Sequence, residues 1–282
     1  MQKTKIYNSQ AGKEAILAFY DRVLERWPLP YQSLTVTTRL GSTHVISCGE
    51  RANPPLVLLH GSSSNAAMWI GDVLEYARCF RVFAVDIPGE PGKSAETRPD
   101  LSAQGYNAWL AEVCSGLGIH NTMLAGISLG GFIALRYGIE FPERVEKLAL
   151  LCPGGVAPQR SSFLLLAMVM LPLGEWGRDR LIRMVNGDQE IAAEAVQYTK
   201  LIGSEFRPRL ERLPIVSEDE LKRLDMPVLL LVGEKDVLLD SEKTARRLER
   251  LLPRLEAHIF EDKGHVLIGM AERIMTFLVR GR

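Results

Sequence analysis

The sequence predicts an α/β fold in which helices cover a mainly parallel β-sheet and a helical insert interrupts that sheet. Short apolar segments bounded by turn residues alternate with helical stretches along most of the chain. A hairpin-like pattern precedes this alternation. The alternation breaks once, for about 70 residues after Gly155, and then resumes. These three observations favour one sheet with an insertion.

The N-terminal part predicts a helix followed by a hairpin. Apolar residues recur at helical spacing from about Ser9 to Arg26, where Trp27-Pro28 ends the pattern. Two alternating segments follow, 33–39 and 43–47, separated by Gly41-Ser42, and they predict an antiparallel pair. We therefore treat residues 1–32 as an N-terminal helical extension.

Six short apolar runs predict the strands of the sheet. They are 56–59, 82–85, 123–125, 148–151, 228–232 and 258–260. Between the fourth and the fifth run, residues 156–225 carry helical patterns without a convincing strand, and they include the apolar run Phe163–Leu173. The predicted division is therefore a core of residues 33–155 and 226–282, with a helical cap inserted at 156–225. We expect the apolar run of the cap to shield an apolar substrate pocket.

Composition excludes several classes of protein. The 282 residues contain 34 basic and 34 acidic side chains, so no overall field attracts nucleic acid or an anionic membrane. No apolar run approaches the roughly 20 residues of a membrane span, and the first residues lack the pattern of a secretory signal. Four separate cysteines without a C-x-x-C pair suggest buried free thiols. We expect a cytoplasmic protein that acts on a small neutral molecule.

The strongest chemical signal is Gly126-Ile127-Ser128-Leu129-Gly130, a G-x-S-x-G motif. A predicted strand ends just before it, and the almost wholly apolar stretch Gly131–Phe141 follows as a predicted helix. A turn this tight has no room for side chains two residues before and after the serine. Ser128 would then lie exposed at the start of a helix, where backbone N–H groups favour an oxyanion. The alternative is a serine that only caps the helix.

From about Ser33 to the C-terminus the chain resembles the α/β-hydrolase family. In that family an acid and then a histidine follow the serine, each after a strand. Asp236 follows the predicted strand 228–232, and His265 follows 258–260. The resemblance therefore implies an α/β-hydrolase fold with a catalytic triad of Ser128, Asp236 and His265. A histidine base and its orienting carboxylate are what a serine hydroxyl needs to become nucleophilic.

Other acids and histidines have simpler interpretations. Asp240 directly precedes an amphipathic helix and is interpreted as its N-cap, although it and Glu234 remain alternatives for the acid. His258 lies within a strand and shares a face with Glu256, which indicates a structural role. His44 and His120 show no partner pattern and are interpreted as solvated side chains.

Two further loops have counterparts in the family. His60-Gly61-Ser62 follows a predicted strand, and by resemblance the backbone N–H groups of Ser62 and Leu129 would form the oxyanion hole. Relatives often carry more glycine where this chain has three serines. The segment 86–94 contains Gly-Lys-Ser, but Ile87 stands where a phosphate-binding loop needs glycine. It instead resembles a loop common in α/β-hydrolases, longer here by one residue.

Together these features predict a serine carboxylesterase that needs neither a cofactor nor a metal and acts on a small, apolar ester or acyl compound. Epoxide hydrolases and haloalkane dehalogenases of similar fold use an aspartate nucleophile, which Ser128 argues against. Thioesterase, C–C hydrolase, cofactor-free haloperoxidase and acyltransferase activities share the triad and stay open. A ligand-binding or signalling protein on the same fold is the rival from another class.

Overall fold

The computed structural model describes residues 5–101, 105–187 and 189–281. Its centre is an eight-stranded sheet with the order β1-β2-β4-β3-β5-β6-β7-β8. The strands are β1 (Tyr31–Thr38), β2 (Gly41–Cys48), β3 (Pro55–Leu59), β4 (Arg81–Val85), β5 (Thr122–Ile127), β6 (Val145–Leu151), β7 (Val228–Gly233) and β8 (Leu255–Phe260). From β4 to β8 along the sheet, neighbouring strands pair in parallel. The pairs β1–β2 and β2–β4 are antiparallel. The predicted fold class is confirmed.

Hydrophobic patterning explains the central strands. Every residue of β5 and of β7 is buried, because helices cover both faces of the sheet. Strand β8 lies at the edge of the sheet and is only partly buried, although an apolar run of this kind is typical of a strand buried on both faces. Among the described residues no strand pairs with the outer side of β8, which leaves that side open to solvent.

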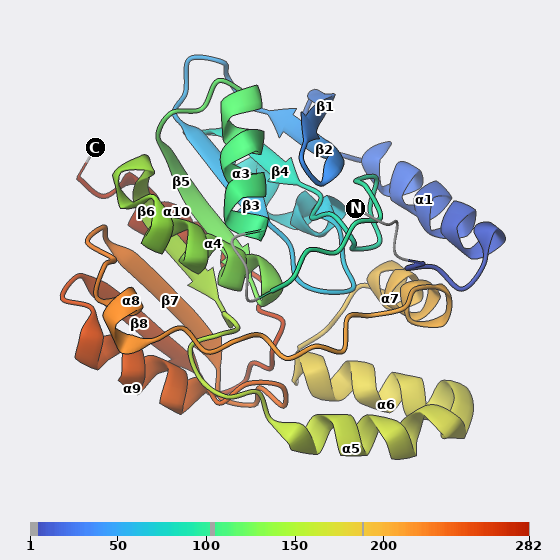
Figure 1. Ribbon diagram of the computed structural model, residues 1–282. Coiled ribbons are helices and arrows are strands. Elements are labelled where there is room, and N and C mark those ends of the chain that lie inside the picture. The colour runs from blue at the N-terminus through green and yellow to red at the C-terminus, as the bar shows by residue number, and fades with distance from the viewer. Residues whose placement is uncertain (1–4, 102–104, 188, 282) are drawn as a thin grey trace.

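Helices surround the sheet in two groups (Figure 1). Helices α3 and α4 pack against each other in front of the sheet in this view, whereas α10 lies behind it and contacts α2. Helix α9 packs on β7 and β8. Their bounds are α2 (Val73–Tyr76), α3 (Gly105–Gly116), α4 (Leu129–Glu140), α8 (Glu218–Leu221), α9 (Ser241–Leu251) and α10 (Ala271–Val279), with short 3₁₀ turns η1 (Ala66–Gly71) and η2 (Pro142–Arg144).

The insert between β6 and β7 is helical, and its long helices lie together at the lower right of Figure 1. They are α5 (Ser161–Met170), the 3₁₀ turn η3 (Leu171–Leu173), α6 (Gly174–Asn186) and α7 (Ala193–Glu205). The apolar run of the insert is not wholly shielded. Leu166 and Met170 are half-buried, but Leu165, Met168 and Val169 are more than 60% exposed. One side of α5 therefore faces solvent, and the expectation that the run shields a substrate pocket stays a prediction for its half-buried side.

Helix α1 (Gln10–Leu24) packs against α7 of the insert. Ser9 caps it by accepting a hydrogen bond from the N–H of Gly12. The rings of Phe19 and Tyr198 stack with centroids 4.4 Å apart. A small second core of Ile6, Tyr7, Ile16, Ile202 and Phe206 joins the same two segments. The N-terminal helix therefore packs both on the insert and on the main core.

Candidate active site

Ser128 lies in the tight turn between β5 and α4. Its backbone has φ 54° and ψ −110°, a conformation that L-residues rarely adopt and that costs about 1–3 kcal/mol. Hydrogen bonds on both sides hold it there: its N–H donates to the carbonyl of Leu151, and its carbonyl accepts from the N–H groups of Phe132 and Gly154. The residue is partly exposed although both flanking elements are buried. The turn therefore presents the hydroxyl at the carboxyl edge of the sheet.

The two glycines of the motif are required by close backbone contacts. A Cβ atom on Gly126 would lie 2.4 Å from the carbonyl oxygen of Gly130. A Cβ atom on Gly130 would lie 2.3 Å from the carbonyl oxygen of Leu59. Neither position has a flexible neighbour that could move away. The steric explanation given for the motif agrees with these distances.

Asp236 and His265 meet at the same edge of the sheet. Oδ2 of Asp236 lies 2.7 Å from Nδ1 of His265, and both side chains are buried. Oδ1 of Asp236 accepts hydrogen bonds from the N–H groups of Leu238 and Leu239, at 2.7 and 2.9 Å. Burial alone would raise the pKa of Asp236, but the hydrogen bond with His265 and these two N–H groups hold it below its usual range. The carboxylate is therefore fixed in place and ionised.

The other candidate acids are occupied elsewhere. Asp240 caps α9 by accepting a hydrogen bond from the N–H of Lys243, as its position in the sequence predicts. Glu234 is exposed.

Within the described ranges the hydroxyl of Ser128 makes no hydrogen bond, so this structure does not join it to His265. Serine–histidine contacts are often loose before substrate binds.

The predicted oxyanion loop passes beside Ser128. A Cβ atom on Gly61 would lie 3.5 Å from Cβ of Ser128. In the part of the chain described, the N–H groups of Ser62 and Leu129 donate to no acceptor. Two unused N–H groups near a nucleophile are what an oxyanion hole requires.

A buried carboxyl supports this loop, and sequence reasoning did not identify it. Oε2 of Glu90 accepts a hydrogen bond from the N–H of Ser63 at 2.7 Å, and Ser63 has a positive φ of 55°. Oε1 of Glu90 is buried and has no partner in the described residues. Burial raises the pKa of Glu90 to about 7, although Ser63, Arg98 and Arg209 oppose the shift. In the sequence, the one feature that set this segment apart was the extra residue in 86–94, and it did not point to Glu90.

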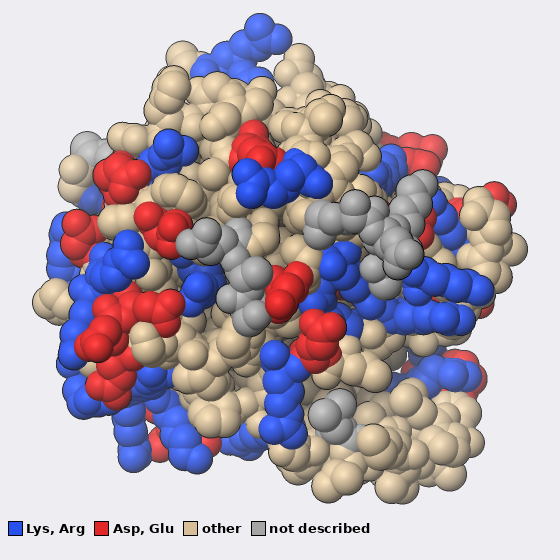
Figure 2. Space-filling model, in the orientation of Figure 1, with Lys and Arg blue, Asp and Glu red and all other residues tan. Residues whose placement is uncertain are grey.

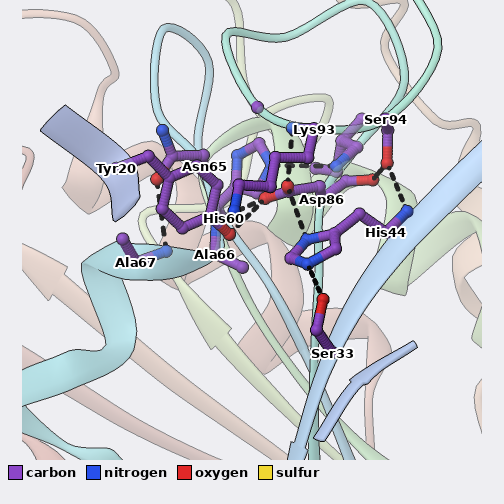
Figure 3. A network of polar contacts seen from close by, with 12 residues as sticks. Tyr20, Ser33, His44, His60, Asn65, Ala66, Ala67, Asp86, Lys93 and Ser94 are labelled. Carbon is purple, nitrogen blue, oxygen red and sulfur yellow. Dashed lines mark hydrogen bonds and ion pairs between the residues drawn. The ribbon is translucent and has the colours of Figure 1, made fainter. Parts of the chain in front are cut away.

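Asp86 organises a second polar network behind the loop (Figure 3). Its carboxylate accepts hydrogen bonds from the hydroxyl of Tyr20 and from the N–H groups of Ala66 and Lys93, and it also contacts Nδ1 of His44 at 3.1 Å. Burial alone would raise the pKa of Asp86, but the hydrogen bond and charge of His44, the charge of His60 and the N–H of Ala66 hold it below the usual range. The Gly-Lys-Ser segment thus closes around a carboxylate, which gives its backbone a structural role.

The interpretation of His44 as a solvated side chain is wrong. It is 5% exposed, and its Nε2 lies 2.8 Å from the hydroxyl of Ser33. Ser33, His44 and Asp86 therefore form a second Ser-His-Asp chain of contacts (Figure 3). Ser33 sits in the regular strand β1 and not in a strained turn. No spacing in the sequence indicated this chain of contacts, because three separate elements contribute the residues. His120 is exposed, and His258 contacts Glu256, as predicted.

Cys152 lies next to the candidate acid and base. Its Sγ and ligand atoms of Asp236 and His265 all lie within 4.8 Å of one another, a spacing that suits a metal ion. Burial raises the pKa of the Cys152 thiol well above its ordinary value, and the charge of Asp236 adds to this. A metal site would need the thiolate. The protonated thiol of Cys152 is therefore a poor metal ligand.

The insert is tied to each loop of the candidate site. The N–H of His265 donates to the carbonyl of Val185 at the end of α6. The N–H of Arg160, just before α5, donates to the carbonyl of Leu238 beside the acid. Nδ2 of Asn65, at the end of the oxyanion loop, contacts the hydroxyl of Tyr198 in α7 at 2.6 Å. The insert is therefore hydrogen-bonded to the histidine loop, the acid loop and the oxyanion loop.

The fold and the strained serine turn define a class of hydrolase, and the comparisons with known proteins name the family. Residues 56–275 match the model described as "Alpha/beta hydrolase family". The chain belongs to this family. Carboxylesterase YbfK of Bacillus subtilis is 30% identical over 287 residues, which cover 96% of this chain and 97% of the relative. The "uncharacterized carboxylesterase nap" of the same organism is 30% identical over 272 residues, covering 92% and 90%.

Solved structures agree at the level of the whole chain. The crystal structure of carboxylesterase CesB (YbfK) from Bacillus subtilis superposes with a TM-score of 0.86 at 27% identity. The match covers 96% of this chain and all of that structure. The insert and the N-terminal helix are therefore included in the similarity. Within the described ranges, no helix is both long and apolar enough to cross a bilayer.

Proposed function

We propose that this protein is a carboxylesterase that cleaves small apolar esters through an acyl-enzyme on Ser128. The observation that carries the proposal is the meeting of three features at one sheet edge. These are a strained, partly exposed serine, a buried His265–Asp236 pair at 2.7 Å, and a loop with an unused N–H group beside the serine. The names of the two Bacillus subtilis relatives support the same reaction.

In the proposed mechanism His265 removes the proton of the Ser128 hydroxyl while the hydroxyl oxygen attacks the ester carbonyl. Asp236 keeps the proton of the imidazole on Nδ1, so that Nε2 is free to act as the base. The N–H groups of Ser62 and Leu129 stabilise the oxyanion, each being worth about 10²–10³ in rate. His265 then protonates the leaving alcohol, and water releases the acid by the same route.

We also propose that residues 156–225 act as a cap that shapes the substrate pocket. Bonds from the insert to the acid loop, the histidine loop and the oxyanion loop support this role. A cytoplasmic location is a further proposal. All four cysteines are free, and Cys79 is exposed, contrary to the expectation of burial; an exposed thiol suits a reducing compartment.

Labelling with a fluorophosphonate probe tests the proposed nucleophile, and the second Ser-His-Asp chain supplies a matched control. We expect wild-type protein and Ser33→Ala to be labelled, and Ser128→Ala to be unlabelled and inactive on p-nitrophenyl esters. Ser33 lacks the turn that exposes a nucleophile beside unused N–H groups. Labelling that disappears in Ser33→Ala but persists in Ser128→Ala would overturn the assignment. Tight binding of apolar ligands without ester turnover would favour the binding-protein alternative.

A further inference from the structure

The outer surface of the α5–α6 hairpin exposes an unusual amount of apolar side chain. Six large residues between positions 165 and 176 are 51–70% exposed: Leu165, Met168, Val169, Leu171, Leu173 and Trp176. They lie on α5, η3 and the first turn of α6, so they follow one another along a continuous segment. We call this set the hairpin patch. Soluble proteins rarely leave such contiguous apolar surface without a partner.

Helix α5 contributes its outer face to the hairpin patch. The helix contains no charged residue. Leu165, Met168 and Val169 recur at spacings of three and four, so they share the outward side, while Leu166 and Met170 are half-buried on the other side. Figure 2 shows a surface almost free of charge over α5 and α6, at the lower right.

Helix α6 adds positive charge next to this apolar surface. Arg180 and Arg183 follow Trp176 by four and seven residues, so all three lie on one exposed face of the helix. Among the described residues, neither arginine forms an ion pair. The acids of α6, Glu175 and Asp179, are instead bound by Lys200 of α7. The face that carries Trp176 is therefore apolar and positive, although the whole chain is neutral.

We propose that the hairpin patch docks this protein on the surface of an anionic lipid bilayer. An apolar helix face with a tryptophan and flanking arginines is the composition of helices that lie in the interface of a membrane. The arginines would bind lipid phosphates while Leu165, Met168 and Trp176 enter the acyl region. The charge pattern favours a bilayer over a second copy of this chain, because two such patches would bring like charges together.

The place of the patch gives this docking a functional consequence. The segment before α5 is bound to the loop of Asp236, and the end of α6 is bound to the loop of His265. A docked hairpin would therefore hold the candidate site close to the membrane surface. The docking itself goes beyond the proposed esterase activity and does not depend on it.

Vesicle sedimentation tests the proposal separately from catalysis. Vesicles of ether-linked lipids contain no ester bond, so binding is measured without turnover. We expect wild-type protein to bind vesicles with 30% phosphatidylglycerol headgroups more tightly than pure phosphatidylcholine vesicles, and binding to weaken at 0.5 M salt. Replacing both Arg180 and Arg183 by glutamine should lower the partition coefficient on anionic vesicles about tenfold or more. Replacing both Leu165 and Met168 by glutamate should abolish binding to either kind.

Two matched variants control for unspecific effects. Leu74→Glu changes an exposed apolar residue on α2, and Arg51→Gln changes an exposed arginine between β2 and β3; neither should alter binding. All patch residues are exposed, so these variants should fold, which a melting temperature within a few degrees of wild type checks. Failure of wild-type protein to bind either vesicle would overturn the proposal. So would equal binding by the patch variants, or a dimer in sedimentation velocity that Leu165→Glu dissociates in the absence of vesicle binding.

Discussion

Replacement of Asp236 by asparagine tests the candidate acid more sharply than its removal. Oδ1 of the carboxylate accepts two backbone N–H groups, from Leu238 and Leu239, while Oδ2 faces His265. An asparagine must keep its oxygen on the two N–H groups, because its amide nitrogen cannot accept them. The amide nitrogen then faces Nδ1 of His265. That nitrogen can only donate, so Nδ1 must become an acceptor and the imidazole proton moves to Nε2.

The imidazole of His265 then already carries a proton on Nε2, the atom that should receive the proton of the Ser128 hydroxyl. We expect Asp236→Asn to lower kcat about 10⁴-fold, which corresponds to about 5 kcal/mol of transition-state stabilisation. KM should change little, because the substituted atom does not contact substrate in the proposed mechanism. The assay is steady-state hydrolysis of p-nitrophenyl butyrate at pH 8.

Asp240→Asn is the matched control, since it makes the same chemical change at the N-cap of α9, in the loop that also carries Asp236. Asparagine caps a helix about as well as aspartate, so both activity and melting temperature should stay near the parent values. Thermal unfolding of both variants must lie within a few degrees of wild type, so that lost activity is not lost folding. Full activity of Asp236→Asn would refute the reasoning and point to another acid, with Glu234 the next candidate.

Three further predictions concern the supports of the site. Gly130→Ala should cost about 3 kcal/mol or more in urea unfolding, because its Cβ meets a carbonyl oxygen at 2.3 Å, whereas Gly203→Ala, with open space around it, should be neutral or stabilising. The pKa of Glu90 is about 7 in the folded protein and 4.5 in the unfolded chain, so ionisation of Glu90 lowers the stability of the fold as pH rises across that window. The free energy of unfolding of Glu90→Gln should therefore equal that of wild type at pH 4 and exceed it by up to about 3 kcal/mol at pH 8. Equal differences at both pH values would contradict this. Tyr20→Phe removes a hydrogen bond to Asp86 and should cost about 1.5–3 kcal/mol, measured by the same unfolding assay.

The sequence by itself determined the sheet, the insert and the residues proposed for the triad. Buried strands are continuous apolar runs, and their carboxyl ends meet at one edge, so loops that follow them converge whatever their sequence separation. The glycines at positions 126 and 130 report a turn too tight for side chains, and this local constraint is visible in five residues. The strands and the glycine turn depend on neighbours along the chain, so the sequence pattern predicted them, whereas the assignment of Asp236 and His265 also used the resemblance to the α/β-hydrolase family.

Only the tertiary structure decided which polar residues support the site. His44, Asp86 and Glu90 carry no motif, because their partners come from β1, α1 and the oxyanion loop. Burial among these partners, and not residue type, sets their protonation and their role. The same holds for the apolar run of the insert. Its composition predicted a shield over an apolar pocket, but only the structure shows that one face of α5 is half-buried while the other stays exposed.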